Sequence, residues 1–297
     1  MLAGLNNEPR EALEFLMLLT DLKGSYMDIS STTHLFRFRG DNINTINELV
    51  NNVIWHSKYA GLNDPFEMFF QLDDSGLEKL PLNDIAKILA KTKFLSERRA
   101  YVEQCFYQKN MTEIYGFIRE HWGESFIKTM LSIYRKSVTV ACFTKACDSR
   151  LMWGYYGNGM KGICFAYNKE KLRESGLEFA DVIYSDAPPK IDTYKHLVEN
   201  LRDIPITLDA LFSLRKHKDW INEQEVRSLK YLEADELYEH QPGLAVQINP
   251  GCIEAIIIGE RLAGDMRSFV ESYAKKNDIA LLIAKADFTS YKVQIEG

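Results

Sequence analysis

The sequence predicts an α+β fold with mainly antiparallel sheets and one helical insertion. Short strand-like segments, rich in β-branched and aromatic residues, occur on both sides of a long helical stretch at 82–136. Helical segments do not alternate strictly with strand segments, as they would in a doubly wound parallel fold. No internal repeat or low-complexity linker interrupts the chain, so we expect a single domain over residues 1–297 that contains the insertion.

The N-terminal residues predict a helical extension over 1–31. Within it, residues 8–23 have the pattern of an amphipathic helix, and Pro9 suits its first turn. Its apolar face is formed by residues at helical spacing, namely Phe15, Leu18, Leu19 and Leu22. We expect this face to pack on the domain or on a second copy rather than in a membrane.

Alternation of residue types predicts the first strand at 34–39, with one face open to solvent. A helix broken near Pro205 is predicted over 192–218, and another helix over 265–277. Further strands are predicted at 53–57, 138–143, 161–167, 179–184, 225–232, 244–248, 253–258, 279–284 and 291–295.

The composition excludes some classes of function. With 297 residues, 46% of them hydrophobic, the chain can bury a large core. The net charge of −6 disfavours general nucleic-acid coating, because nonspecific phosphate binding needs clustered Lys and Arg. The acidic balance and the lack of a set of metal-binding carboxylates also argue against a metal-dependent nuclease.

The cysteines and the termini indicate a cytoplasmic protein. Five cysteines form no disulfide-scaffold spacing, so we expect reduced thiols. Cys142 and Cys147 lack a second pair at finger spacing, and we expect no metal. The N-terminus lacks the features of a signal peptide, and no apolar run has the length of a membrane span.

Two glutamates in the segment 220–227 are candidate catalytic residues. In an extended strand, Glu223, Glu225 and Arg227 would point to the same face. Adjacent carboxylates beside an arginine can divide labour, one stabilising positive charge while the other orients a hydroxyl. The alternative is a ladder of salt bridges on an edge strand.

Aromatic and glycine residues are concentrated at 150–159. Trp153, Tyr155 or Tyr156 could stack on a planar ring of a ligand, above all a cationic ring. The glycines would let the backbone approach that ligand closely. Alternatively, the aromatic residues fill the core while the glycines form a hairpin.

Two further segments carry candidate ligand-binding residues. Arg37 and Arg39 flank a phenylalanine on the first strand and could contact phosphate or carboxamide groups, or be surface charges. Asn63 and Asp64 lie in a turn before Pro65. This turn either holds their side chains toward a ligand or only caps the next segment of the chain.

These segments together resemble an uncharacterised bacterial and phage family known as a domain of unknown function. The resemblance covers roughly residues 34–295. Its motif segments are Leu35–Arg39, Asn63–Glu67, Cys142–Thr144, Met152–Tyr156, Gly162–Cys164, Trp220–Arg227 and Ile253–Gly259. The sequence departs from the family pattern at Gly154-Tyr155, where a polar pair is more usual, and at Val226, where an aromatic residue is common.

The order of an arginine-bearing strand, a middle aromatic turn and a late Glu-x-Glu also resembles the ADP-ribosyltransferase superfamily. This resemblance implies a split sheet, with NAD held by Arg37 or Arg39. It also implies nicotinamide stacking on Tyr155 or Tyr156, and Glu225 or Glu223 acting at the ribose. Breaking the nicotinamide–ribose bond develops positive charge that a carboxylate stabilises.

The resemblance implies an NAD-dependent ADP-ribosyltransferase or NAD glycohydrolase, acting as a toxin or phage-defence effector. The acceptor could be a protein, a nucleic acid or a small molecule. The alternative is a non-catalytic domain whose pocket senses a nucleotide.

Overall fold

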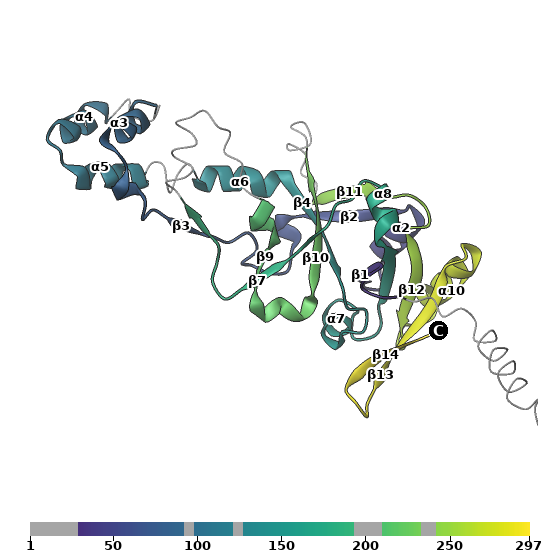
Figure 1. Ribbon diagram of the computed structural model, residues 1–297. Coiled ribbons are helices and arrows are strands. Elements are labelled where there is room, and N and C mark those ends of the chain that lie inside the picture. The colour runs from purple at the N-terminus through teal and green to yellow at the C-terminus, as the bar shows by residue number, and fades with distance from the viewer. Residues whose placement is uncertain (1–28, 92–97, 121–126, 193–209, 233–241) are drawn as a thin grey trace, which may run out of the picture. The chain divides into compact units, whose positions relative to one another are not determined.

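The structure is a computed structural model that describes residues 29–91, 98–120, 127–192, 210–232 and 242–297 (Figure 1). The chain groups into two compact units. The first comprises Met1–Asn42, Ala146–Lys171 and Gly251–Gly297, and the second comprises Ile43–Lys145 and Leu172–Pro250. The helix expected over 8–23, and most of the predicted extension over 1–31, lie outside the described residues.

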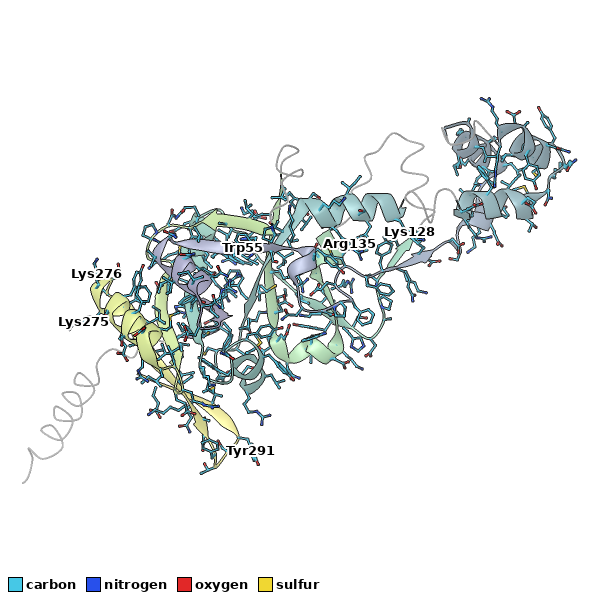
Figure 2. All side chains as sticks on the ribbon, turned by 180° about the vertical axis from the view of Figure 1, so that it is seen from behind. Trp55, Lys128, Arg135, Lys275, Lys276 and Tyr291 are labelled. Carbon is cyan, nitrogen blue, oxygen red and sulfur yellow. The ribbon has the colours of Figure 1, made fainter. Side chains whose placement is uncertain are left out.

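The first unit contains a mixed sheet. Its strands neighbour one another in the order β1 (His34–Arg39), β5 (Ile163–Asn168), β12 (Ile253–Gly259), β13 (Ala280–Asp287) and β14 (Lys292–Glu296). All neighbours are antiparallel except β12 and β13, which are parallel. A parallel pair needs a crossover, and helix α10 (Gly264–Lys276) provides it. Lys275 and Lys276 lie in the last turn of α10, where they complement the helix dipole (Figure 2).

The core of the first unit lies around β1. The prediction that one face of this strand is open to solvent is wrong. Phe36 and Phe38 pack in a cluster with residues of β5 and β12. Leu35 and Arg37, which point to the other face, are also buried, at 1% and 5% exposure. Strand β1 is therefore covered on both faces, and only Arg39 at its end is half-buried rather than buried. The alternation of residue types along β1 therefore does not indicate a solvent-exposed face.

The second unit contains an antiparallel sheet. Its strands are β11 (Gly243–Gln247), β2 (Val53–Lys58), β4 (Val138–Thr144), β10 (Glu225–Tyr231) and β6 (Ala180–Asp181). Each of these strands pairs with the next one named. Two parallel pairs of short strands accompany this sheet. They are β3 (Gln71–Asp73) with β8 (Lys190–Asp192), and β7 (Ile183–Ser185) with β9 (Arg215–His217).

The described part of 82–136 is helical, as the sequence predicts. It holds α3 (Leu82–Lys91), α4 (Arg99–Tyr107) and α5 (Met111–Ile118), and α6 (Ile127–Ser137) begins in it. The first three share a small core of their own, which includes Ile85, Val102 and Ile114. The other α-helices in the described ranges are α2 (Ile43–Val50), α7 (Arg150–Tyr155) and α8 (Lys169–Glu174). Short 3₁₀ helices there are η1 (Tyr59–Gly61), η2 (Leu77–Lys79), η5 (Ala210–Leu214) and η6 (Lys218–Glu223).

The helix predicted over 192–218 is wrong at its C-terminal end. Residues 210–218 form η5, then β9, and then enter η6, while most of the predicted helix lies outside the described residues. Pairing of β9 with β7 overrides the local helical preference there.

The fold class is confirmed: the molecule combines helices with mostly antiparallel sheet. Whether the sheets correspond to the split sheet of the ADP-ribosyltransferase superfamily stays a prediction. Among the residues that the structure describes, no helix combines the length and the apolar character that crossing a bilayer requires.

Candidate functional site

The second unit contains a pocket of about 460 Å³. This volume lies within the range typical of small-molecule sites, roughly 300–1,000 Å³. Its walls come from the turn at 64–69, the segment after β7, strand β9 and helix η6. The residues that line it are Asp64, Pro65, Phe66, Phe69, Ser185, Asp186, Ala187, Pro188, Pro189, Arg215, Lys216, His217, Asp219 and Trp220.

The Asn-Asp-Pro turn forms one wall of the pocket. The Asp64 carboxylate accepts a hydrogen bond of 2.9 Å from the backbone N–H of Phe66, and this contact fixes the turn. Successive side chains of this turn differ in their exposure to solvent. Phe66 is 68% exposed and packs edge-to-face with Phe69, whereas Glu67 is 2% exposed. The aromatic rings therefore line the pocket while Glu67 enters the interior.

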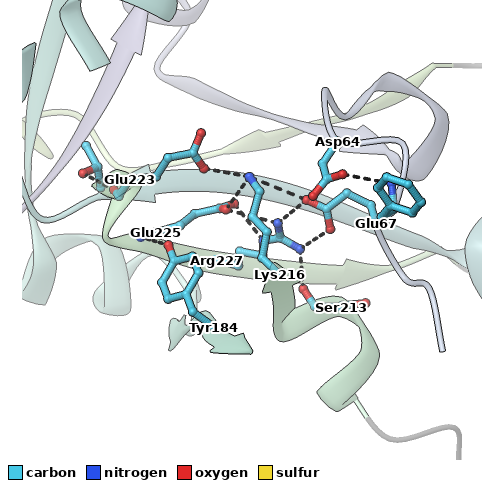
Figure 3. Close-up of polar contacts among 10 residues, drawn as sticks. Asp64, Glu67, Tyr184, Ser213, Lys216, Glu223, Glu225 and Arg227 are labelled. Atoms are coloured by element: carbon cyan, nitrogen blue, oxygen red, sulfur yellow. Dashed lines mark hydrogen bonds and ion pairs between the residues drawn. The ribbon is translucent and has the colours of Figure 1, made fainter. Parts of the chain in front are cut away.

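Beside the pocket lies a buried group of ionisable residues, here called the charge cluster: Glu67, Lys216, Glu223, Glu225 and Arg227 (Figure 3). Arg227, at 1% exposure, is its centre. The guanidinium donates two hydrogen bonds to Glu67 and two to Glu225, of which Nε to Glu225 Oε1 is 2.7 Å. It also donates to the carbonyl of Ser213 at 2.6 Å. The arginine thus joins β10 to the 64–69 turn and to η5.

Lys216 connects the charge cluster to the pocket. Its Nζ donates to Glu223 Oε2 at 2.7 Å and to Glu225 Oε2 at 3.2 Å, and it lies 3.8 Å from Glu67 Oε1. The same ammonium lies 4.6 Å from the centre of the Trp220 ring. Lys216 lines the pocket, but neither Glu223 nor Glu225 does.

The neighbouring cations determine the ionisation of Glu225, whereas burial determines that of Glu67. Burial alone raises the pKa of Glu225, but the charge and hydrogen bonds of Arg227, helped by Lys216, outweigh it and lower that pKa to about 2. Burial dominates at Glu67 and raises its pKa despite Arg227. Burial lowers the pKa of Lys216, but Glu225 and Glu223 outweigh it, so this pKa lies above its ordinary value. Glu225 is therefore ionised and paired with its two cations at neutral pH.

Tyr184 supports Glu225 from β7. Its hydroxyl accepts a hydrogen bond of 2.8 Å from the backbone N–H of Glu225, and burial raises the pKa of this phenol to about 12. The tyrosine is therefore a neutral group that fixes the start of β10.

Arg215 differs from the other charged groups on the pocket wall. Its Nε is buried, and within the described part of the chain the guanidinium makes no hydrogen bond or ion pair. The neighbouring charges are paired: Lys218 contacts Asp186 at 2.6 Å, and His217 contacts Asp219 at 3.0 Å. Arg215 is therefore available to hold an anionic group of a ligand.

The structure brings together some of the residues that the sequence singles out. Glu223 and Glu225 both contact Lys216. The prediction of one extended strand is wrong for Glu223, because this residue ends η6 and only Glu225 and Arg227 lie in β10. Glu225 is paired with both Lys216 and Arg227, and Glu223 is paired with Lys216, which the sequence could not reveal. Asp64 lies on the pocket wall, and its neighbour Asn63 is exposed in the same turn.

The other candidate residues belong to the first unit. Arg37 is buried and Arg39 half-buried on β1. Trp153 is 1% exposed, packs edge-on against Phe38 with ring centres 5.0 Å apart, and donates its indole N–H to the carbonyl of Cys147. Trp153 thus fills the core, which was one of the two alternatives.

The two tyrosines next along the chain behave differently. Tyr156 packs against the same core, whereas Tyr155 is 73% exposed. The prediction that residues such as Arg37 and Tyr155 share a site with Glu225 stays a prediction.

Sequence reasoning missed Arg215 and Lys216, because the segment that holds them has a helical pattern. Phe66 and Glu67 were visible as part of the Asn63–Glu67 motif, and Trp220 as part of the 220–227 motif. A stronger signal was the run Arg215-Lys216-His217-Lys218, in which four consecutive basic or imidazole side chains precede the glutamate pair.

Part of the chain matches a known protein family. Residues 152–228 match the model of a family described as "Protein of unknown function (DUF2971)". The matched span contains three of the motif segments, 152–156, 162–164 and 220–227. Neither the search of curated proteins nor that of solved structures found a match. The resemblance to the ADP-ribosyltransferase superfamily stays a prediction, whereas over residues 152–228 the match confirms the resemblance to an uncharacterised family of unknown function.

Proposed function

We propose that the second unit binds a nucleotide, and that NAD is the ligand to test first. The observation that carries this proposal is the pairing, within one pocket, of an aromatic wall with an arginine that has no partner among the described residues. Phe66, Phe69 and Trp220 offer ring faces for a planar base, and the Arg215 guanidinium suits a phosphate. Binding pockets typically combine such apolar walls with a few polar groups that orient the ligand.

The charge cluster favours binding over catalysis. A transferase or glycohydrolase of this type needs a carboxylate beside the ribose carbon where positive charge develops. Both oxygens of Glu225 are held by Arg227, and one is also held by Lys216. Neither glutamate lines the pocket. A nucleotide-sensing or regulatory role therefore has better support than ADP-ribosyl transfer.

The catalytic role remains a second candidate because of one observation. Glu223 and Glu225 both contact Lys216, and Lys216 itself lines the pocket. A ligand that displaces Lys216 would expose the carboxylates to the ribose.

Calorimetric titration of the full chain with NAD and with AMP tests the proposal. We expect saturable binding and a loss of affinity of at least tenfold in Arg215→Ala, because the phosphate loses its charged partner. Arg99→Ala, which removes an exposed arginine of α4, is the matched control and should leave the affinity unchanged. Absence of binding, or equal affinity in Arg215→Ala and the parent chain, would contradict the proposal.

Nicotinamide release separates the two candidates. A binding protein will hold NAD without turnover, alone or with cell lysate. Release that disappears in Glu225→Gln would support the transferase or glycohydrolase instead.

A further inference from the structure

We infer that strand β14 is the surface through which two copies of this chain pair, edge to edge, as a symmetric dimer. Within the described part of the chain, β14 is the last strand of the first unit's sheet and pairs only with β13 (Figure 1). Its outer edge therefore presents backbone N–H and C=O groups that no described strand engages. Such an edge is a template for one further strand.

The sequence of β14 is complementary to itself. It has a cation at its first position, Lys292, and an anion at its last, Glu296. Antiparallel pairing about a two-fold axis at Gln294 places Lys292 of each copy opposite Glu296 of the other. Val293 of each copy then lies opposite Ile295 of the other, so apolar residues meet apolar residues.

No neighbouring register has this complementarity. A shift by one residue places polar side chains opposite apolar ones, because side chains alternate between the two faces of a strand. A shift by two residues keeps the faces matched but loses both ion pairs. The charges and the apolar residues of β14 therefore favour the same register, the one centred on Gln294.

The side chains of β14 are available for these contacts. Lys292 is exposed, and its ammonium makes no hydrogen bond or ion pair with any residue that the structure describes. Glu296 contacts Lys285 of β13 at 2.5 Å in a solvent-exposed pair, and its carboxylate can accept from a second cation as well. On the other face, Val293 is buried and Ile295 half-buried in the core of the first unit. Pairing would continue this apolar face from one copy into the other.

The hairpin that carries β14 is already ordered. The Asp287 carboxylate accepts hydrogen bonds from the backbone N–H and the hydroxyl of Thr289, at 2.8 and 2.6 Å, and from the hydroxyl of Ser290. It also accepts one from the side-chain amide of Gln294 at 3.1 Å. These contacts fix the turn between β13 and β14. An edge that is held in its paired conformation loses little conformational entropy on association.

The same register gives a partner to an exposed aromatic residue at the hairpin tip. Tyr291, 79% exposed, lies at this tip (Figure 2) and falls opposite Gly297 of the second copy. Glycine has no side chain, so an aromatic ring across from it can cover its backbone. Tyrosine is also enriched in protein–protein interfaces. Pairing thus buries a side chain that a single copy exposes.

Sedimentation equilibrium of the full chain over a series of concentrations tests the inference. We expect a reversible equilibrium between monomer and dimer. Lys292→Glu should weaken the dimer about tenfold, because both symmetry-related contacts with Glu296 change from attraction to repulsion. Lys276→Glu makes the same charge change at an exposed residue of α10 and is the matched control, which should leave the dimer unchanged.

An exchange of the two charges tests the two-fold register. Glu296→Lys alone should also weaken the dimer. The double variant, Lys292→Glu with Glu296→Lys, again places opposite charges across the axis and should recover most of the lost affinity. Damage to the fold of the hairpin would instead accumulate in the double variant.

Three results would overturn the inference. They are a chain that stays monomeric at every concentration, a dimer that Lys292→Glu leaves intact, and a double variant that is no tighter than the single ones. Each of these results leaves the proposed nucleotide binding untouched, because the pocket lies in the second unit and β14 in the first.

Discussion

Arg227 is the residue on which the site in the second unit depends. Its guanidinium is buried and contacts Glu67, Glu225 and the carbonyl of Ser213, so it connects segments up to 160 residues apart in the sequence. Two bidentate carboxylate contacts and the Ser213 carbonyl together engage its five N–H donors. A buried arginine with fewer partners would be costly, because the desolvation of the charge would not be offset.

Replacing Arg227 with Ala should destabilise the fold strongly. The substitution leaves Glu67 and Glu225 buried without their main cation, and breaking one side of a buried ion pair costs about 3–5 kcal/mol. Urea denaturation measures the change in the free energy of unfolding. The control Arg99→Ala breaks an exposed pair with Glu103 on α4 and should cost at most about 0.5 kcal/mol. Equal effects of the two substitutions would refute the central role of Arg227.

The depressed pKa of Glu225 predicts a specific dependence of stability on pH. The folded-state pKa is about 2, against 4.5 for the free side chain. Because the folded value is the lower one, the contribution of Glu225 is complete above about pH 4.5 and is lost as the pH falls toward 2. The stability difference between the parent chain and Glu225→Gln should therefore be constant above about pH 5 and narrow toward pH 2. A difference that stays constant down to pH 2 would show that Glu225 is not held by its cations.

At the scale of elements, the junction between η6 and β10 positions the glutamate pair. Gln224 caps η6 in the left-handed conformation, with φ 44° and ψ 48°, and thereby lets the chain turn into the strand. Glu223 and Glu225, on either side of it, both point to Lys216. Strand β9 then supplies Lys216 from the neighbouring parallel pair.

Substitutions of Gln224 should change the free energy of unfolding as expected for a residue whose backbone is in the left-handed conformation. Left-handed backbone costs a residue with a Cβ atom about 1–2 kcal/mol, and a β-branched side chain is worse than an unbranched one. Gln224→Val should therefore lower the free energy of unfolding by about 1 kcal/mol, whereas Gln224→Gly should leave it unchanged or raise it. Thermal and urea denaturation will measure both.

Gln108 is the matched control because it is also an exposed residue that caps a helix, but its φ is −78°. Gln108→Gly should give no gain in stability. If the substitution to glycine lowers the free energy of unfolding as much at 224 as at 108, the left-handed conformation does not govern the stability of this junction.

The elements themselves were partly predictable from the sequence. Strands such as β4 and β12 are rich in β-branched residues, which are a local signal. The end of the helix predicted over 192–218 was wrong because β9 exists only through its pairing with β7, a contact that no local pattern contains. The solvent-exposed face expected for 34–39 was wrong for the same kind of reason, since burial on both faces depends on what packs there.

At the scale of the whole molecule, the fold class could be predicted from the order of segments, but the pocket could not. Glu223, Glu225 and Asp64 were identified because their motifs are unusual in composition. Arg215 and Lys216, which line the pocket, lie in a segment with a helical pattern. Glu223 pairs with Lys216, Glu225 pairs with Lys216 and Arg227, and Arg227 in turn pairs with Glu67, which is 160 residues away in the sequence. Such ion pairs between distant segments cannot be deduced from the spacing of residues in the sequence.

The most direct test of the account is a crystal structure of the full chain with NAD. We expect the ligand in the pocket of the second unit, with a planar ring against Trp220 or Phe66 and a phosphate on Arg215. Ligand bound instead at Arg37 and Tyr155 of the first unit, with the pocket of the second unit empty, would contradict the account.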